Sequence, residues 1–442
     1  MAADVRLMKT AAELALADAF AAVKSTLPGD AAVAAQRTAA FETFASVGLP
    51  HRRVESWRYT DLRALLREAP PLASAAGPEA LARSLAACPM LAGMEARRIY
   101  VVNGAFVSDI SDLANLEPGV SISSLATALG AADPLVAHLG QTVASSDAAL
   151  ALNTAFMGDG VVIALAEGAT LSRPLHLVFV TTEATATAAY TRSLLVMGKG
   201  ASAQVIESHE GPAGAAYQVN TALEVVVGEG ASLERVKITA EGNDALHIST
   251  LLARVADGAK LANANFTLGG AIIRNQLLVQ LAGEGIDASL SGVSLLAGKQ
   301  HSDTLLAVEH IAPNCQSREQ FRTVVDDTAR DIFQGRISVR QSAQKTDARM
   351  MSRALLLSDT AESDNKPELE IFADDVQCGH GCTTGSLDQQ LKFYMMSRGI
   401  PEKEAEALLI QAFVGEVIDA IGHEGVRAAL TDATRNWLIE RK

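Results

Sequence analysis

The stretch Val225-Val-Val-Gly-Glu-Gly-Ala-Ser-Leu233 decides the fold, because its pattern returns at regular intervals along the chain. A β-rich run leads into a charged residue, a glycine and a small residue, and alternation of apolar and polar residues follows. Regular turns between short strands are typical of a stacked coil, in which each turn buries its apolar face against its neighbours. The glycines of the pattern, whose spacing shrinks from 32 to 27 residues, are Gly168, Gly200, Gly230, Gly258 and Gly285.

A β-sandwich is the alternative to a coil. Turn signals in a sandwich usually recur every ~8–12 residues, without so strict a longer repeat. A left-handed hexapeptide coil is disfavoured, because no six-residue period holds beyond one turn. Asn103-Gly104 lies between two short apolar runs and predicts a hairpin near the start of the β-rich region. A helical insert is expected over about 124–145.

Helical segments flank the β-rich region on both sides. Residues 1–97 carry apolar residues at helical spacing, and Asp30 is placed to cap the second helix. Helical periodicity returns after residue 384 and continues to the end of the chain. We therefore expect an N-terminal helical domain at 1–97, a mainly β core at 98–383 and a C-terminal helical domain at 384–442.

The second C-terminal helix has an unusually wide apolar face. Ser386 and Gln389 predict a capping box for the first helix, and Pro401 predicts the first position of the second. The stripe on the second helix is about twice as wide as a lone surface helix needs, which favours a docking site as well as packing. Its members are Ala405, Leu408, Leu409, Ala412, Phe413, Val417, Ile418 and Ile421.

Composition excludes several classes of function. The chain has 37 basic and 51 acidic residues and a net charge of −14, which argues against nucleic acid or an anionic membrane as a partner. Four cysteines in 442 residues are too few for a disulfide framework and favour a reducing compartment. No apolar run approaches a membrane span, and the N-terminus lacks a signal pattern. We expect a soluble, cytoplasmic protein.

The stretch from Phe372 to Ser386 holds the strongest candidate for metal chemistry. If residues 378–382 are extended, Cys378, His380 and Cys382 project to one face, because side chains alternate along a strand. Thiols and imidazole are donors that iron and zinc prefer. The alternative is a tight turn at the intervening glycines, with the cysteines as small buried fillers. The spacing differs from the usual zinc pattern of two separated pairs.

Two further polar stretches are weighed against plainer interpretations. His51 to Leu62 combines arginines with Trp57 and Tyr59, which favours a packing anchor over stacking on a base or phosphate. The polar residues between 301 and 331 alternate with apolar ones, as half-solvated strands do. Asp326, Asp327 and Asp331 are the acidic candidates there for a catalytic group.

Three segments together resemble the SufD family, which are subunits of the SufBCD iron–sulfur cluster assembly scaffold. They are Gly48–Leu62, Asp374–Gly381 and Asp388–Ile400. The Cys-x-His-Gly order at 378–381 favours SufD over its paralogue SufB. The order of helices, repeated strands and helices agrees as well, so the resemblance covers nearly the whole chain.

The resemblance implies a right-handed parallel β-helix with helical domains at both ends. It implies a non-catalytic subunit that pairs with SufB, with a SufC ATPase on its C-terminal domain and a transient iron–sulfur cluster at the SufB interface. It assigns cluster assembly to His380, with Cys378 also matching the motif. Cys382 departs from the family pattern and receives no role. The residues expected to contact SufC are Leu408, Leu409, Phe413 and Val417.

No glycine loop ending in Lys-Ser/Thr is present, so ATP is expected to be handled by a partner. A homodimer of the isolated chain is allowed, and the use of a flavin stays open. Two rival functions remain: a stand-alone metal-binding protein that uses Cys378, His380 and Cys382, and a β-helix enzyme acting on polysaccharide, which needs carboxylates in an open groove.

Overall fold

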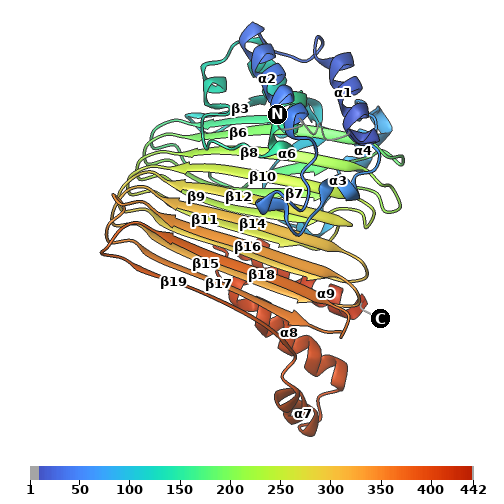
Figure 1. Ribbon diagram of the computed structural model, residues 1–442, viewed down its shortest axis with the longest axis vertical. Helices are drawn as coiled ribbons and strands as arrows, with labels where there is room; N and C mark the ends of the chain where they lie inside the picture. The colour runs from blue at the N-terminus through green and yellow to red at the C-terminus, as the bar shows by residue number, and fades with distance from the viewer. Residues whose placement is uncertain (1–8, 441–442) are drawn as a thin grey trace, which may run out of the picture.

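Two long sheets face each other along a coil in the computed structural model, which describes residues 9–440 (Figure 1). Successive strands fall alternately in one sheet and the other from β4 onward, so each pair of strands makes one turn. The ten-stranded sheet contains β1 (Arg97–Val102), β2 (Ala105–Val107), β5 (Leu175–Val180), β7 (Ser202–Glu210), β9 (Ser232–Ala240), β11 (Lys260–Thr267), β13 (Asp287–Leu296), β15 (Gln316–Val325), β17 (Asp347–Leu356) and β19 (Gln377–Ser386). The nine-stranded sheet contains β3 (Val120–Ser124), β4 (Val161–Leu165), β6 (Ala188–Met197), β8 (Gln218–Val227), β10 (Leu246–Val255), β12 (Ile272–Leu281), β14 (His301–His310), β16 (Arg330–Val339) and β18 (Glu362–Ile371).

Nearly all strand pairs are parallel, which confirms the β-helix and excludes the sandwich. Within the described residues, antiparallel pairing joins only β1 to β2 and β3 to β4. The first of these pairs is the hairpin predicted at Asn103-Gly104.

The repeated glycines sit at the turns, as predicted. Gly200, Gly230 and Gly258 have φ angles of 65°, 63° and 60°, a left-handed conformation that glycine adopts without steric cost. The turns also stack. The Gly200 amide donates to the Glu229 carbonyl at 2.8 Å, and the Gly230 amide donates to the Asp257 carbonyl at 2.8 Å. The repeat in the sequence therefore follows from one turn geometry used again on each level.

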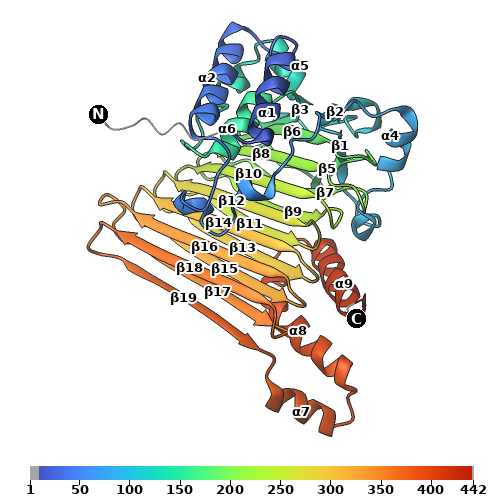
Figure 2. The same ribbon diagram turned by 45° about the vertical axis from the view of Figure 1, so that its right-hand side comes forward.

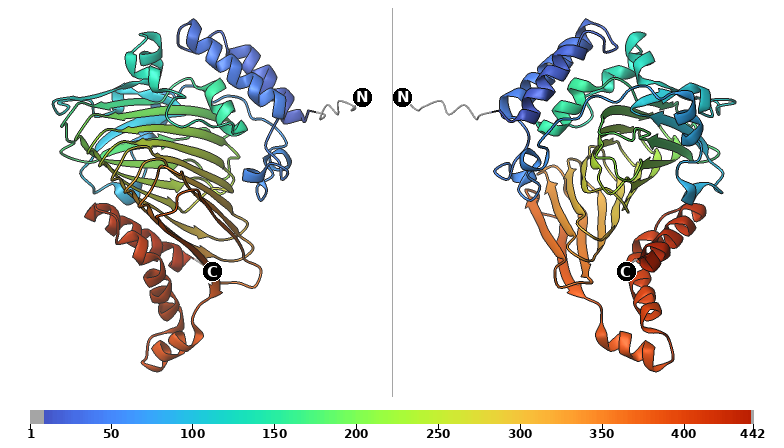
Figure 3. Two further views of the ribbon diagram at one scale, coloured as in Figure 1. Left: turned by 60° about the vertical axis from the view of Figure 1, so that its left-hand side comes forward. Right: turned by 90° about the vertical axis from the view of Figure 1, so that its right-hand side faces the viewer.

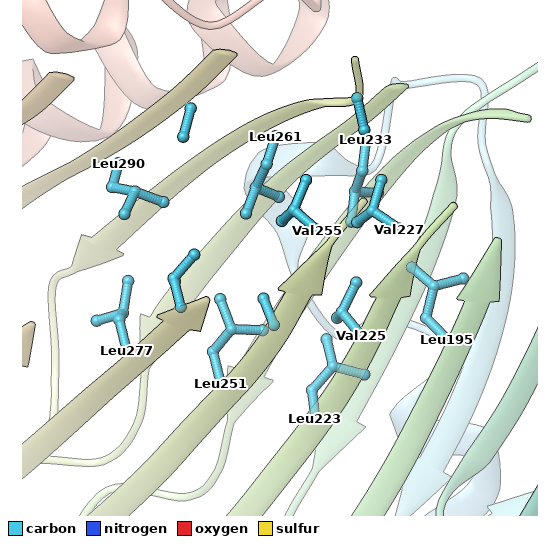
Figure 4. Close-up of a cluster of buried hydrophobic side chains, with 14 of the residues drawn as sticks. Leu195, Leu223, Val225, Val227, Leu233, Leu251, Val255, Leu261, Leu277 and Leu290 are labelled. Atoms are coloured by element: carbon cyan, nitrogen blue, oxygen red, sulfur yellow. The ribbon is translucent and has the colours of Figure 1, made fainter. Parts of the chain in front are cut away.

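One half of the coil interior is apolar, and the other half is polar. The apolar half is a continuous cluster between the two sheets, shown in Figure 4 around Leu223, Leu251 and Leu277. Along β9 the inward positions change from Leu233 to Arg235 and Lys237, which are buried as well. Buried charged groups need partners, and the strands supply them to each other across neighbouring turns.

The N-terminal helices cover one end of the coil (Figure 2). Asp30 caps α2 as predicted, because its carboxylate accepts from the Val33 amide at 2.9 Å. The helical insert predicted at 124–145 is partly right, because α5 and η4 lie within it. The helical segment continues beyond residue 145 with α6, which packs on α2 and the coil. The helices before the C-terminal region are α1 (Ala11–Val23), α2 (Ala31–Val47), η1 (Glu55–Trp57), α3 (Leu62–Leu65), α4 (Pro78–Ser84), η2 (Pro89–Leu91), η3 (Ser108–Ile110), α5 (Leu125–Gly130), η4 (Pro134–His138) and α6 (Ala148–Phe156).

The C-terminal helices are α7 (Gln389–Ser397), α8 (Glu402–Ile418) and α9 (Glu424–Glu440). The predicted capping box is wrong: Ser386 ends β19, and the carboxylate of Asp388 caps α7 instead. Pro401 is the N-cap of α8 and not its first helical residue. Figure 3 shows α8 and α9 lying along the outer face of the coil, while α7 stands beyond it.

Candidate functional site

The strand that carries the Cys-Gly-His-Gly-Cys motif is the last strand of its sheet. β19 is bonded to β17 on one side, and no further strand of the described chain pairs with its other side. Exposed strand edges can pair with another chain. The predicted extended conformation of the motif is confirmed, and the tight-turn alternative is wrong.

The three metal-type side chains share one face of β19, as predicted. Cys378 is in register with Ala348, His380 with Met350, and Cys382 with Ser352. All three of these β17 residues are buried, and Ala348 and Met350 belong to the core inside the coil. The motif therefore faces the interior column of the coil at the point where the coil stops.

The three donors are exposed to different degrees and are not gathered around one point. Cys378 is half-buried, whereas His380 and Cys382 are exposed. All four cysteines, including Cys88 and Cys315, are free thiols. Within the part of the chain that the structure describes, the one group of three close metal-type ligand atoms lies elsewhere. The end of the coil therefore presents separate donors along a strand edge. The ligand atoms of Cys378, His380 and Cys382 do not form an assembled three-ligand site.

A pocket of about 570 Å³ adjoins the motif. Glu319 of β15 lies in the same interior column as His380, two strands further in, with Met350 between them. Within the described residues, no charged group pairs with the Glu319 carboxylate at salt-bridge distance; burial raises the pKa of this group to about 7, against smaller opposing effects from the Ser317 hydroxyl and the charge of Arg318. The pocket residues are Arg318, Glu319, Gln320, Arg349, Met350, Met351, Gln377, Cys378, Gly379 and His380.

The raised pKa of Glu319 predicts a stability that depends on pH. The group has an ordinary pKa of 4.5 and about 7 when folded, so between these values the unfolded chain binds fewer protons than the folded chain. The free energy of unfolding therefore falls as pH rises through this window. Glu319→Gln removes the cost of ionising the buried group, and we expect it to stabilise the chain at pH 8 by up to about 3 kcal/mol.

Denaturant unfolding at pH 4.5 and pH 8 measures this effect. The gain should be near zero at the lower pH, and the control Glu167→Gln, at an exposed turn position, should show no gain at either pH. A Glu319→Gln variant that is no more stable than wild type at pH 8 would mean that this carboxylate has a partner in solution.

Sequence reasoning missed Glu319 because it grouped the polar residues of this region as half-solvated. One signal was present: Glu319 is in phase with Phe321 and Val325 along β15, and Phe321 belongs to the core. A charged residue in phase with core residues indicates a polar position inside the coil.

The apolar stripe of α8 is largely occupied by the coil. Val417 is only 2% exposed and packs with Val414 against outward-facing residues of the ten-stranded sheet. Leu409 and Phe413 are half-buried, and Phe413 lies under the Arg322 guanidinium at 5.7 Å. Leu408 is 42% exposed. Packing on the coil therefore accounts for most of the width of the stripe.

The apolar surface without a covering layer lies on α7. None of its residues is buried. Lys392 ties α7 to α8 through ion pairs with Glu402 at 2.8 Å and Glu406 at 2.5 Å. The exposed apolar side chains are Leu391, Phe393, Tyr394 and Met396, with exposed fractions of 45%, 72%, 54% and 40%.

The arginine-rich segment around Trp57 is a packing anchor, as the plainer interpretation predicted. Trp57 is 1% exposed, and its indole N–H donates to the Asp147 carboxylate at 2.6 Å. The guanidinium of Arg274 stacks 4.5 Å from the Trp57 ring and pairs with Asp303 at 2.5 Å. Thr60 donates to the same Asp303 carboxylate.

The acidic candidates for a polysaccharide enzyme do not line a groove. Asp331 is buried inside the coil, where burial raises its pKa to about 7. Asp326 and Asp327 follow β15 at a turn, and the Asp327 carboxylate accepts from the Gly298 amide at 2.9 Å. Asp331 is thus enclosed in the coil, whereas Asp326 and Asp327 lie at a turn, so the three carboxylates do not form one catalytic group.

The fold defines a parallel β-solenoid with helical regions at both ends and thiol and imidazole groups at its open end. Two family models match: the SUF system FeS cluster assembly SufBD core domain at residues 179–413, and the SufBD protein N-terminal region at residues 11–177. The chain therefore belongs to the SufBD family of iron–sulfur cluster assembly proteins and is SufD-like.

Three relatives span most of both chains. The iron–sulfur cluster assembly protein SufD of Escherichia coli is 32% identical over 394 residues, which cover 86% of this chain and 87% of its own. A SufBD family protein of Synechocystis is 30% identical over 402 residues, covering 89% and 88%. The chloroplastic protein ABCI7 of Arabidopsis thaliana is 26% identical over 416 residues, covering 90% and 84%. No helix within residues 9–440 is long and apolar enough to cross a membrane.

Proposed function

We propose that this chain is a non-catalytic scaffold subunit that pairs with SufB at the open end of the coil and supports assembly of iron–sulfur clusters there. The observation that carries the proposal is β19: an edge strand presents His380 and Cys378 without a complete ligand set of its own. The cluster is cargo, and SufB supplies the remaining ligands. Four free thiols fit a reducing cytoplasm.

The chemistry of the two donors suits a transient cluster. His380 is exposed and offers an imidazole nitrogen, which binds iron when neutral. Burial raises the pKa of the Cys378 thiol, so this group holds its proton until a metal or a base removes it. A cluster bound through one exposed imidazole and one thiol that keeps its proton is bound less tightly than a cluster bound by four thiolates. Weaker binding of this kind allows the cluster to be released to a recipient protein.

The interface with SufB uses strand edges. β18 and β19 end the two sheets, and their outer edges carry unpaired backbone groups. Beside His380, Gly379 has open space where a side chain would be, so a partner backbone can approach closely. The same edges allow a homodimer when SufB is absent.

The ATPase SufC is proposed to dock on α7 and the adjoining part of α8, including Leu408. The four exposed apolar residues of α7 support this assignment, because surface apolar groups gathered on a short helix favour a protein partner. Val417 is buried against the coil and is not part of this docking surface. ATP hydrolysis then resides in SufC.

Variants on α7 test the docking surface. We expect the double substitution Leu391→Ser and Phe393→Ser to abolish co-purification of SufC, because it removes apolar area that only a partner would bury. Melting temperature should not change, since both side chains are exposed. The matched control is Leu85→Ser, at a leucine that is 53% exposed but lies outside the C-terminal region.

One outcome would contradict this assignment. SufC binding that is undiminished in the α7 variant would move the docking site elsewhere. Deleting the whole segment 386–442 is a poorer test, because removing α8 would expose the apolar face of the coil that it covers.

Co-expression tests the proposed function as a whole. A tagged form of this chain should retain SufB and SufC together, with iron and acid-labile sulfide in the purified complex. If the isolated chain carried the same amount of sulfide as the complex, the stand-alone metal-binding function would be favoured. Failure to retain SufB would contradict the scaffold proposal.

A further inference from the structure

A second group of metal-type side chains lies inside the coil, far from β19 along the stack of turns. His209 at the end of β7, Glu241 just after β9 and His247 of β10 each offer a ligand atom, and these atoms lie within 4.8 Å of one another. All three residues are buried. The rings of His209 and His247 meet edge to face, with centroids 4.7 Å apart.

The surroundings of His209 leave one ring nitrogen available. Its Nε2 lies 2.6 Å from the carboxylate of Glu207, and the Arg235 guanidinium holds that carboxylate with contacts of 2.7 and 3.2 Å. Among the residues that the structure describes, no hydrogen-bond partner contacts the buried Nδ1 atom of His209. A carboxylate on one nitrogen that leaves the other free is the arrangement found around metal-binding histidines.

The other two donors are also held by outer partners. The Glu241 carboxylate accepts from the Tyr217 hydroxyl at 2.6 Å through one oxygen and lies 3.0 Å from His247 Nδ1 through the other. His247 Nε2 lies 2.9 Å from the ammonium of Lys237. Outer contacts of this kind fix ring orientation before a ligand arrives.

We propose that His209, His247 and Glu241 form a buried binding site for a divalent transition-metal ion of the zinc or ferrous class. Two imidazoles and one carboxylate are a ligand set that such ions accept. The ion binds His209 Nδ1, a Glu241 oxygen and His247 Nδ1. The proton that His247 Nδ1 shares with Glu241 leaves to solvent, and the Lys237 ammonium passes one proton to His247 Nε2, so the ring stays neutral and the resulting amine accepts from it.

The charged neighbours of the ligands have partners of their own. The Lys237 ammonium, which lies beside His247, also donates to Thr239, Ser249 and Asn275. The Arg235 guanidinium holds the Glu207 carboxylate beside His209. The ligand atoms are therefore surrounded by fixed polar contacts.

This site is independent of cluster assembly at the coil end. The ligands contain no thiol, and none of them belongs to the last turns of the coil. Because the side chains of His209 and His247 are fully buried, the ion enters while the chain folds. It binds the turns of β7, β9 and β10 together.

Cobalt is the probe, since Co²⁺ replaces zinc or ferrous ions and absorbs visible light. The full chain with His380→Ala, Cys378→Ser and Cys382→Ser, which removes the donors of β19, is produced in cobalt-supplemented medium and treated with chelator. We expect one cobalt ion per chain by elemental analysis, with visible bands and no sulfur-to-cobalt charge-transfer band. His209→Gln and, separately, Glu241→Gln should each lose the ion and its visible bands.

His310→Gln is the matched control. His310 is also fully buried, also has an unpartnered Nδ1 and contacts Ser317 at 3.0 Å, but it lies outside the cluster, so this variant should keep its cobalt. Absence of cobalt from the parent chain, retention in both cluster variants, or equal loss in His310→Gln would each overturn the proposal. If either His209→Gln or Glu241→Gln fails to fold, the other variant decides. Metal should raise the melting temperature of the parent and of His310→Gln, and should leave that of the two cluster variants unchanged.

Discussion

His380→Ala is expected to lower the iron and acid-labile sulfide of the co-expressed complex by about an order of magnitude or more, since losing even an outer partner of a ligand typically costs 10–100-fold in metal affinity. The reason is geometric. His380 is an exposed imidazole on an edge strand, in line with the interior column of the coil. Removing the imidazole should leave folding and the binding of SufB and SufC intact, because the His380 side chain is exposed and alanine keeps the backbone pairing with β17.

Substituting the neighbouring cysteines should lower the iron and sulfide content by smaller amounts. Cys378→Ala should lose less cluster than His380→Ala, because the Cys378 thiol is half-buried and holds its proton. Cys382→Ala should lose least. Thr383→Ala, at an exposed position of the same strand, is the control. Wild-type iron and sulfide in the His380→Ala complex would remove this residue from the site. A loss in Cys382→Ala as large as that in His380→Ala would favour three donors acting together.

Trp57→Ala is expected to lower the free energy of unfolding by about 3–5 kcal/mol. Trp57 is almost fully buried and fills the space between the N-terminal segment and the coil. The substitution removes the ring on which Arg274 stacks and the indole N–H that donates to Asp147. A buried guanidinium then faces a cavity, which adds to the cost.

Denaturant unfolding followed by circular dichroism measures this loss. Arg52→Ala lies in the same segment, but the Arg52 side chain is 77% exposed and pairs with Asp61 at 3.4 Å. Its effect should stay within about 0.5 kcal/mol. Equal stability of Trp57→Ala and wild type would show that the segment is not anchored through this residue.

The coil itself was predictable because its earlier turns use glycine at one position that has a positive φ, although Asn314 and Lys345 take this position in the later turns with φ angles of 61° and 63°. Gly230 therefore marks the same position in the sequence and in the structure. The polar half of the interior was not predictable in this way. Lys237 alternates with apolar residues along β9 just as a solvent-facing lysine would, and only the neighbouring strands show that it is buried.

The candidate site was predicted in part. Alternation placed Cys378, His380 and Cys382 on one face, which holds because β19 is extended. Sequence alone could not show that this face continues the interior column, because that depends on pairing with β17. The stripe on α8 predicts docking as well as packing, and the structure shows the packing on the coil; periodicity gives the width of an apolar face and not what covers it. The His209 cluster was missed because its ligands come from three separate strands and turns.

The most direct test of the scaffold proposal is the rate at which a maleimide labels Cys382. This thiol is exposed on β19, whereas Cys88 and Cys315 are buried, and Cys378→Ser removes the half-buried one. The monomeric fraction of the isolated chain should label rapidly. In the complex with SufB and SufC, labelling should slow by an order of magnitude or more, about as expected for a side chain buried in a seam. Labelling of Cys382 at the same rate in both states, with SufB still bound, would contradict a SufB interface at the end of the coil.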